Sequence, residues 1–419
     1  MPISGVRRLW AALLVALGSL TGTLNGQSDP ELAELKRFFT ASVAEEGIVG
    51  AGLYLVGRNG VIDSTFAGFG DRDERRPVTG ATIWHWASIT KTFTAIGIMQ
   101  LRDRKLLSLD DPIVKYVPEL RAVHNPHGSM DAITLRHLLS HTAGFRGGTW
   151  PWGGDKPWHP FEPTEWSQLV AMLPYTEILF PPGSRFSYSN PGVIFLGETI
   201  RRLTGDEYEV YADKNLLDPL GMYDSYYDVT PYHLRTRRSN NYYVRDGQAQ
   251  PNGIDFDTGI TTSNGGLNAP LADMARYVQF LLGGVPARTP AGAPPVLARA
   301  SLEEMWRPVI TAGGGSGNVE QASVALGFFI TELPAGVRLI GHTGSQAGFR
   351  SFFWLHPESG TAIIANFNTS PPSESAGPEV KPRIGKLFSG LVQRYAKWTA
   401  ERSRVEESRR ETMRDDERR

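Results

Sequence analysis

The chain has 419 residues, enough for one large core or for two domains, and 41% hydrophobic with 21% charged residues is typical of a soluble globular protein. A formal net charge of −1 gives no overall attraction to nucleic acid or anionic lipid, so nucleic-acid binding is not expected. Cysteine is absent, which excludes disulfides, thiol catalysis and a lipid-modified N-terminal cysteine.

Residues 1–26 have the pattern of a secretory signal peptide. Arg7 and Arg8 precede an apolar run over 9–20, and small and polar residues follow. The run is too short to span a bilayer comfortably, and no other segment approaches membrane length, so an uncleaved anchor is the less favoured alternative. We therefore expect an exported protein, periplasmic or secreted, with no stable membrane span after cleavage between Gly22 and Gln27.

The segment after the signal peptide predicts a helix followed by a hairpin. Glu31 to Glu45 has an amphipathic helical pattern, and two short apolar runs, 50–56 and 61–68, follow it. The tetrapeptide between these runs ends in Asn59-Gly60, a strong hairpin signal.

Helical patterns dominate from about residue 100 to about 280, and strand character returns near the C-terminus. The later strands are expected at 324–331, 337–341, 349–355 and 361–367, before a helix over 384–398. Strands at both ends predict an α+β fold in which one antiparallel sheet, flanked by helices, carries an inserted helical lobe. The expected domain covers 27–400. The tail 401–419 holds seven arginines and seven acids and is expected to be solvated or disordered.

Ser88 and Lys91 form the only Ser-x-x-Lys in the chain. One helical turn would put both side chains on one face of a helix that begins near Ser88. A serine hydroxyl becomes a good nucleophile when a base takes its proton, and a lysine kept neutral by burial can be that base. A four-residue pattern also arises by chance, and such a lysine is often an exposed partner of the serine.

Two further motifs make chance a poor explanation. Tyr188-Ser189-Asn190 is the only Tyr-x-Asn, and His342-Thr343-Gly344 is the only His-Thr-Gly or Lys-Thr-Gly. In this order the three motifs resemble the active-site elements of the serine β-lactamase and penicillin-binding protein superfamily, and Tyr-x-Asn resembles its class C branch. The surrounding segments resemble recurring blocks of the same family: SITKTFTAIGIMQLRDRKLLSLDDPIVKYVPEL (88–120), ITLRHLLSHTAGF (133–145), LLDPLGM (216–222) and GHTGSQAGF (341–349).

The resemblance implies a two-lobed β-lactamase/transpeptidase-like fold with the active site in the groove between the lobes. Ser88 would be the nucleophile, and Lys91 or Tyr188 the general base, a choice that the sequence leaves open. A phenol beside a lysine ammonium can be partly ionised, so Tyr188 would pass a proton to the leaving group. By resemblance, the N–H of Ser345 pairs with that of Ser88 as an oxyanion hole.

The remaining motif residues are expected to bind the substrate. Asn190 would orient Lys91 and bind a substrate carbonyl, and His342, Thr343 and Gly344 would lie on a strand edge open to an extended substrate. The histidine departs from the β-lactamase lysine, although some DD-peptidases, D-aminopeptidases and esterases of the family have it. An unperturbed imidazole becomes charged only near pH 6.5, so it attracts a carboxylate less than an ammonium does.

Other sites are not indicated. No serine lies in Gly-x-Ser-x-Gly, the nucleophile motif of α/β-hydrolases. His137 and His141 have the spacing of a His-Glu-x-x-His zinc helix, but Leu138 stands where the general-base glutamate would be. We therefore expect no metal and no cofactor. The loop 147–166 has four tryptophans, which either form a wall of the groove or pack on the helical lobe.

The sequence thus predicts an exported serine hydrolase that cleaves an amide or ester through an acyl-enzyme, with D-alanyl peptides as one substrate class. A carboxylesterase or weak β-lactamase of the same fold is the first alternative. A non-turnover acyl-binding sensor or a scaffolding protein is the second. The partner is a small-molecule or peptide substrate, and the sequence does not determine the oligomeric state.

Overall fold

A computed structural model describes residues 29–402, except 148–162, 246, 256–257, 287–288, 290–291, 293, 313–322, 334–335 and 371–384. The predicted signal peptide, nearly all of the tryptophan-rich loop and residues 403–419 of the charged tail lie outside the described residues. Among those residues, no helix is both long enough and apolar enough to cross a membrane.

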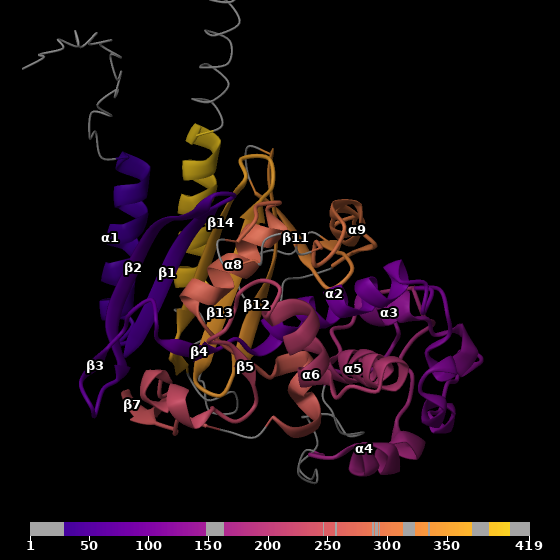
Figure 1. The fold of residues 1–419 in the computed structure, drawn as a ribbon. Helices are drawn as coiled ribbons and strands as arrows, with labels where there is room; N and C mark the ends of the chain where they lie inside the picture. Colours follow the sequence, from indigo (N-terminus) through magenta and orange to yellow (C-terminus); the bar gives the residue numbers. More distant parts are fainter. Residues whose placement is uncertain are drawn as a thin grey trace, which may run out of the picture.

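One lobe is a nine-stranded antiparallel sheet built from both ends of the chain, in the order β3-β2-β1-β14-β13-β12-β11-β10-β9 (Figure 1). Its strands are β1 (Gly50–Gly57), β2 (Gly60–Asp71), β3 (Arg76–Pro77), β9 (Ile310–Thr311), β10 (Ser323–Val324), β11 (Phe329–Leu333), β12 (Val337–Gln346), β13 (Phe349–His356) and β14 (Thr361–Phe367). The two ends of the chain meet where β1 pairs with β14, with Ala51 opposite Phe367. The predicted antiparallel sheet is thereby confirmed.

Helices cover both faces of this sheet. Helix α1 (Pro30–Glu45) and the C-terminal helix, residues 385–402, pack on one face, and α8 (Leu271–Leu281) packs on the other (Figure 1). Alternate residues of β13 serve the two sides: Phe352 and Trp354 face the terminal helices, whereas Phe353 and Leu355 face α8. Because both faces of the sheet are buried, the sequences of its central strands are continuous apolar runs.

The second lobe is mainly helical. It contains α2 (Thr90–Asp103), α3 (Leu135–Leu139), α4 (Trp166–Met172), α5 (Asn190–Thr204), α6 (Tyr208–Ala212) and α7 (Thr262–Gly265), with α9 (Arg299–Met305) farther along the chain. Every residue of α2 from Thr90 to Leu101 is buried. Helix α2 therefore forms the centre of the lobe and not a surface.

Short strands interrupt the region that the sequence assigned to helices. The interrupting strands are β5 (Tyr226–Tyr227), β6 (Tyr242–Arg245), β7 (Gln248–Pro251) and β8 (Leu267–Pro270). With two short strands from outside that region they form two three-stranded sheets: β4 (Ile83–His85) with β8 and β5, and β15 (Thr369–Ser370) with β6 and β7. Runs of two to four residues are too short to show a strand periodicity, which is why they were missed.

The strand predicted over 324–331 was wrong as a single element. The structure divides it into β10 and β11, because Gly327 adopts a φ of 76° and Ala325 N–H donates to Phe328 O at 2.9 Å in a tight turn. A side chain at Gly327 would lie 2.4 Å from Ala95 of α2, so this turn needs glycine for conformation and for space.

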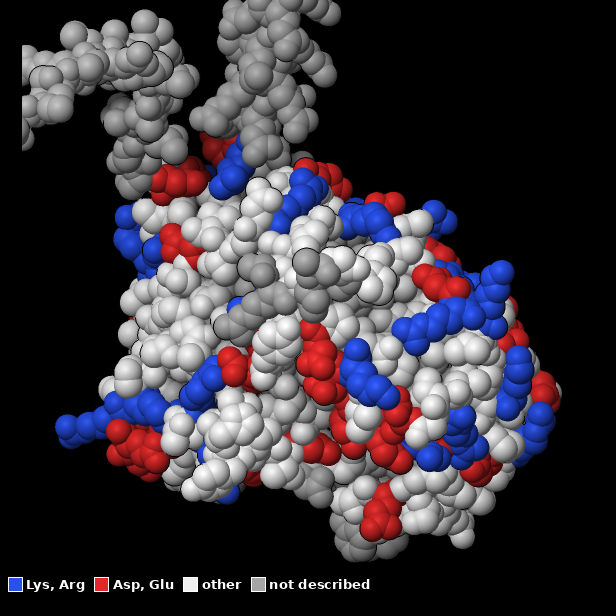
Figure 2. Space-filling model, in the orientation of Figure 1, with Lys and Arg blue, Asp and Glu red and all other residues white. Residues whose placement is uncertain are grey.

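The face in Figure 2 carries lysines and arginines interspersed with aspartates and glutamates. Some charged side chains of the protein join separate elements. Arg202 of α5 pairs with Glu198 of its own helix and, at 2.6 Å, with Glu119 of the short 3-10 helix Pro118–Ala122. Such pairs connect segments at the surface of the helical lobe. Because positive and negative side chains alternate there, they do not form a patch of one charge.

Asp29 ties the two terminal helices together. Its carboxylate accepts from Leu32 N–H at 3.1 Å as the N-cap of α1, and from Trp398 Nε1–H at 2.7 Å. We predict that Asp29→Ala lowers the free energy of unfolding by about 1–2 kcal/mol, measured by chemical denaturation, because a cap and a buried hydrogen bond are lost together. Asp110→Ala, which breaks only an exposed pair with Arg136, should cost less than about 0.5 kcal/mol. Equal losses in the two variants would contradict the tie.

Candidate active site

Ser88 lies in a 3-10 turn, Ala87–Ile89, that leads directly into α2. From Thr82 to Leu101 it is the one residue that is not buried. Its hydroxyl is therefore presented to the outside by a segment otherwise packed in the core. A helix start leaves backbone N–H groups free, which favours negative charge close to the serine.

The turn is held from several sides. Trp86 N–H donates to Leu267 O of β8 at 2.9 Å, and Thr90 Oγ1–H donates to Ala87 O at 2.7 Å. Ser351 of β13 donates its hydroxyl to Trp86 O at 3.2 Å. These bonds hold Ala87 at a φ of 49°, a left-handed conformation that a non-glycine residue adopts at a cost. The strained conformation of Ala87, directly before Ser88, is thus maintained by hydrogen bonds from β8 and β13.

Lys91 follows one turn later and points back at the serine. Its Nζ donates to Ser88 Oγ at 3.0 Å and to the backbone carbonyl of Asn264, in α7, at 2.8 Å. The side chain is 2% exposed, and burial holds its pKa well below the ordinary lysine value. Burial alone thus favours a neutral amine, and a neutral amine at this distance can accept the serine proton.

Tyr188 lies on the loop just before α5, as the sequence predicted, with Lys91 Nζ 5.0 Å from the centre of its ring. Burial raises the pKa of its phenol strongly, and a hydrogen bond with Ser88 lowers that pKa by less. The expectation that a lysine ammonium keeps Tyr188 partly ionised was therefore wrong: desolvation shifts the pKa of the amine and that of the phenol toward their neutral forms. The arrangement supplies a neutral base and a neutral proton donor.

His342 is placed on β12, and its ring packs against Phe329 with 4.8 Å between ring centres. It is 2% exposed, and burial together with Lys91 lowers its pKa to about 3. Its Nδ1 lies 2.6 Å from the carbonyl of Thr343. The imidazole is thus strongly perturbed: it remains neutral well below the pH of about 6.5 at which an unperturbed histidine becomes charged, and it presents no charge to a substrate.

The strand edge beside His342 is open in the described residues. β11 pairs only with Val337 to Gly341 of β12, so the end of β12 from His342 to Gln346 has β13 on one side and no described strand on the other. Gly344 is buried here, whereas Ser345 is exposed. A side chain at Gly344 would lie 2.3 Å from the carbonyl oxygen of Trp86, so glycine lets β12 approach the serine turn.

The Asn190 side chain does not make the predicted contact with Lys91. The hydrogen bonds of Lys91 go to Ser88 and Asn264, and the Asn190 side chain takes no part in them. Asn190 is the first residue of α5, and its backbone carbonyl accepts from the Asn264 side chain at 3.4 Å. Asn190 and Lys91 are thus linked through Asn264.

The sequence analysis missed two contributors to this site. Asn264 holds Lys91 through a backbone carbonyl, which has no signature in the side-chain pattern. His141 has a φ of 54° in a turn, and its ring also packs on Tyr188 with 4.5 Å between centres. Its Nδ1 accepts from Ser189 N–H at 3.2 Å, so it positions the loop that carries Tyr188.

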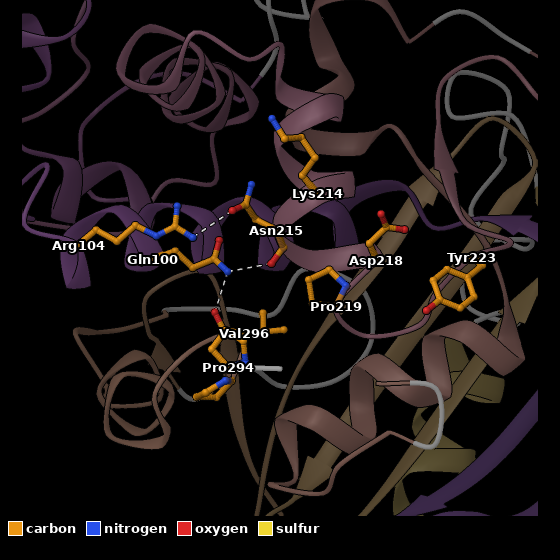
Figure 3. A pocket seen from close by; sticks show the side chains of 10 residues that line it. Gln100, Arg104, Lys214, Asn215, Asp218, Pro219, Tyr223, Pro294 and Val296 are labelled. Carbon is orange, nitrogen blue, oxygen red and sulfur yellow. Dashed lines mark hydrogen bonds between the residues drawn. The ribbon is translucent and has the colours of Figure 1, made fainter. Parts of the chain in front are cut away.

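One cavity of the described residues lies away from the serine site. It measures about 460 Å³ and is bordered by the C-terminal end of α2, the segment 213–219 and residues 294–296 (Figure 3). Gln100 donates to the carbonyls of Asn215 and Val296, at 3.0 and 2.7 Å, and Arg104 donates to Asn215 Oδ1. Gln100 is about 14 Å along the helix from Lys91. Gln100 and Arg104 thus connect α2 to two other segments, and we do not assign them to the serine site.

We predict that Gly344→Ala lowers the rate at which Ser88 reacts with a fluorophosphonate by at least about tenfold, because β12 and the serine turn must separate. The rate is measured by intact-mass spectrometry over time, beside the melting temperature. Gly192→Ala is the matched control, since its added carbon would lie 3.4 Å from Leu138, an ordinary contact. A normal labelling rate in the Gly344→Ala variant would contradict the close-approach argument.

Three of the four buried histidines among the described residues have strongly lowered pKa values and should make the protein acid-sensitive. Burial lowers the pKa of His85 and of His342 to about 3, and of His141 well below its ordinary value, whereas an unfolded histidine takes a proton near 6.5. The unfolded state then binds more protons below about pH 6.5, so the free energy of unfolding falls as pH falls. We predict a loss of about 1 kcal/mol per histidine between about pH 7 and 5.5.

Denaturant titrations at the two pH values measure this loss. In His342→Asn it should be smaller by one histidine's share, while His127→Asn, at an exposed position, should leave it unchanged. Identical losses in wild type and both variants would mean that His342 is not a neutral buried ring.

Comparisons with known proteins support the family resemblance that the three motifs indicated. The profile of the β-lactamase family matches residues 35–381. Esterase EstB of Burkholderia gladioli is 28% identical over 52% of this chain and 56% of its own length, and penicillin-binding protein 4* of Bacillus subtilis is 24% identical over 73% and 65%. Beta-lactamase-like protein 2 of Dictyostelium discoideum is 27% identical over 69% and 52%. The chain thus spans about half to two thirds of these relatives.

Solved structures give the same result for the fold. The octameric penicillin-binding protein homologue of Pyrococcus abyssi has a TM-score of 0.68 at 26% identity, covering 86% of this chain and 77% of that one. A D-stereospecific amidohydrolase from Streptomyces sp. has a TM-score of 0.63 at 25% identity, covering 85% and 98%. A class C β-lactamase superposes with a TM-score of 0.68 at 20% identity over 88% and 98%. With its family profile matched over most of its length, the chain belongs to the β-lactamase family of serine hydrolases.

Proposed function

We propose that this protein hydrolyses an ester or amide through an acyl-enzyme on Ser88, with Lys91 as the general base. The single observation that carries the proposal is the 3.0 Å contact between Lys91 Nζ and Ser88 Oγ, made by an amine whose pKa burial holds well below the ordinary value. A protonated surface lysine could not accept the serine proton, whereas this amine can.

The proposed steps assign a role to each group at the site. Ser88 Oγ bonds to the substrate carbonyl carbon while its proton passes to Lys91 Nζ. The negative charge on the carbonyl oxygen is stabilised by the N–H groups of Ser88 and Ser345. Tyr188, a neutral phenol in contact with Ser88, relays a proton to the leaving group, and water then cleaves the ester and releases the acid. Asn190, Thr343 and Gly344 border the space that the substrate occupies.

The substrate is a small molecule or a peptide. The relatives include an esterase, a penicillin-binding protein and an amidohydrolase, so D-alanyl amides and simple esters both fit the same machinery. The neutral His342 favours substrates without a charge at that position, which weighs against the β-lactamase alternative. Export through the N-terminal signal pattern of residues 1–26 belongs to the same proposal.

We predict that Ser88→Ala abolishes labelling by a fluorophosphonate and lowers kcat/KM for 4-nitrophenyl butyrate by at least about 10³-fold, with the melting temperature nearly unchanged. Ser184→Ala, at an exposed turn, is the control and should label normally. Persistent labelling of the Ser88→Ala variant, seen by intact-mass spectrometry, would overturn the assignment of the nucleophile. Labelling without release of product over many turnovers would favour a non-turnover sensor.

A further inference from the structure

Three buried threonines follow one another at every second position of α2, and the hydroxyl of the third is used differently from the other two. Thr90 and Thr92 each donate to the backbone carbonyl three residues earlier, at 2.7 and 2.8 Å. Thr94 Oγ1 instead lies 2.5 Å from the carbonyl oxygen of Ser263, in α7. The Thr94 hydroxyl therefore connects α2 to a second helix.

Thr94 also contacts Tyr208, the first residue of α6, with 2.7 Å between the two hydroxyl oxygens. A threonine hydroxyl has one hydrogen and a carbonyl oxygen can only accept, so Thr94 donates to Ser263 O and accepts from Tyr208 O–H. Tyr208 thereby orients the Thr94 hydroxyl toward α7. All three residues are buried, so a broken bond here would leave a polar atom with no water to replace its partner.

Helix α7 ends beside these threonines. Gly266 N–H still donates to Thr262 O at 2.9 Å, as in a regular helix. The next N–H, that of Leu267, would continue the helix by donating to Ser263 O, but it donates to Thr90 Oγ1 at 3.1 Å. The carbonyls at the end of α7 must therefore find other donors.

Two side chains of α2 supply those donors. Thr94 donates to Ser263 O, and Lys91 Nζ donates to the next carbonyl, that of Asn264, at 2.8 Å. Residues three apart on a helix lie on one face, so Lys91 and Thr94 hold consecutive carbonyls of α7 from the same side. Because Ser263 and Asn264 are bonded neighbours, a shift of the first carbonyl also moves the second.

The Asn264 carbonyl controls the orientation of the Lys91 amine. A neutral amine has two N–H groups and one lone pair, and only the lone pair can take the serine proton. With one N–H directed at Asn264 O, the lone pair is free to face Ser88, whose Oγ lies 3.0 Å from Nζ. If the carbonyl moved away, the amine could rotate, and proton transfer from Ser88 would slow.

We propose that Thr94 is a positioning residue for the reaction at Ser88. Its hydroxyl, oriented by Tyr208, holds the end of α7 so that the carbonyl of Asn264 fixes the amine of Lys91. The inference rests on the proposed function and adds to it a residue that acts through Lys91. Loss of the Thr94 hydroxyl slows the chemical step and leaves reagent binding unchanged.

The test follows the reaction of Ser88 with a fluorophosphonate at several reagent concentrations by intact-mass spectrometry. These data separate the maximal labelling rate from the concentration that gives half of that rate. We predict that Thr94→Val, which keeps the side-chain shape without the hydroxyl, lowers the maximal rate at least about tenfold and changes the half-saturating concentration less than about threefold. Thr94→Ser restores the donor and should return the rate to within about threefold of wild type.

Thr92→Val is the matched control. Thr92 is equally buried on the same helix, and its hydroxyl also lies between a tyrosine hydroxyl, Tyr277 at 2.7 Å, and a backbone carbonyl. That carbonyl belongs to Ile89, at the start of α2, and not to α7. The control loses the same kinds of hydrogen bond and should keep the maximal rate within about threefold of wild type.

Each outcome decides the role of Thr94. An unchanged maximal rate in Thr94→Val would overturn it. An equal fall in Thr92→Val, a fall that Thr94→Ser does not reverse, or a parallel rise in the half-saturating concentration would also overturn it, since each indicates general damage to α2.

If Thr94→Val does not fold, Tyr208→Phe takes its place: a lowered maximal rate with unchanged half-saturating concentration would support the proposal, and a wild-type rate would overturn it. Wild type that does not label refutes the proposed function. Wild type that labels no faster than Thr94→Val refutes only the role of Thr94.

Discussion

The removal of water from Lys91 is the condition on which the rest of the site depends. An amine in water is protonated and donates only, and the same amine 3.0 Å from a serine hydroxyl in the core can accept a proton. Helix α2 achieves this because it is buried on all sides from Thr90 to Leu101, which requires elements from both lobes to close around it. The second lobe and the sheet are therefore part of the chemistry of the base.

Neutrality extends beyond the lysine. Tyr188, His141 and His342 are packed ring to ring around it, and burial shifts each pKa toward the uncharged form. In such surroundings a charge that develops during reaction is weakly screened, so the few polar groups aimed at it have a large effect. A formal charge lies beside this group on the neighbouring strand β13, where Arg350 pairs with Ser345 and its Nη1 donates to Ser345 Oγ.

The sequence predicted the sheet, most of its strands and the terminal helices, because long apolar runs and amphipathic patterns are local properties. Spacing predicted that Lys91 lies beside Ser88, and resemblance to a known family predicted that Tyr188 and His342 lie close to them. Three features could not be predicted. The carbonyl of Asn264 has no side-chain signature, the depressed pKa of His342 arises from burial by Phe329 and other distant residues, and the exposed or buried state of Arg350 depends on pairing across β12 and β13.

The pairing of Ala51 with Phe367 has a consequence for how the protein matures. During synthesis β1 emerges roughly 300 residues before its partner β14, so the two cannot pair until nearly the whole chain is made. Contacts of such sequence separation also form slowly, because a long loop has to close first. Ser351 and Asn366, which donate to the carbonyls of Trp86 and His85, also belong to the late strands. A nascent chain that lacks β13 and β14 therefore contains Ser88 without the strands that support it, and reactivity should appear only when the whole chain has folded.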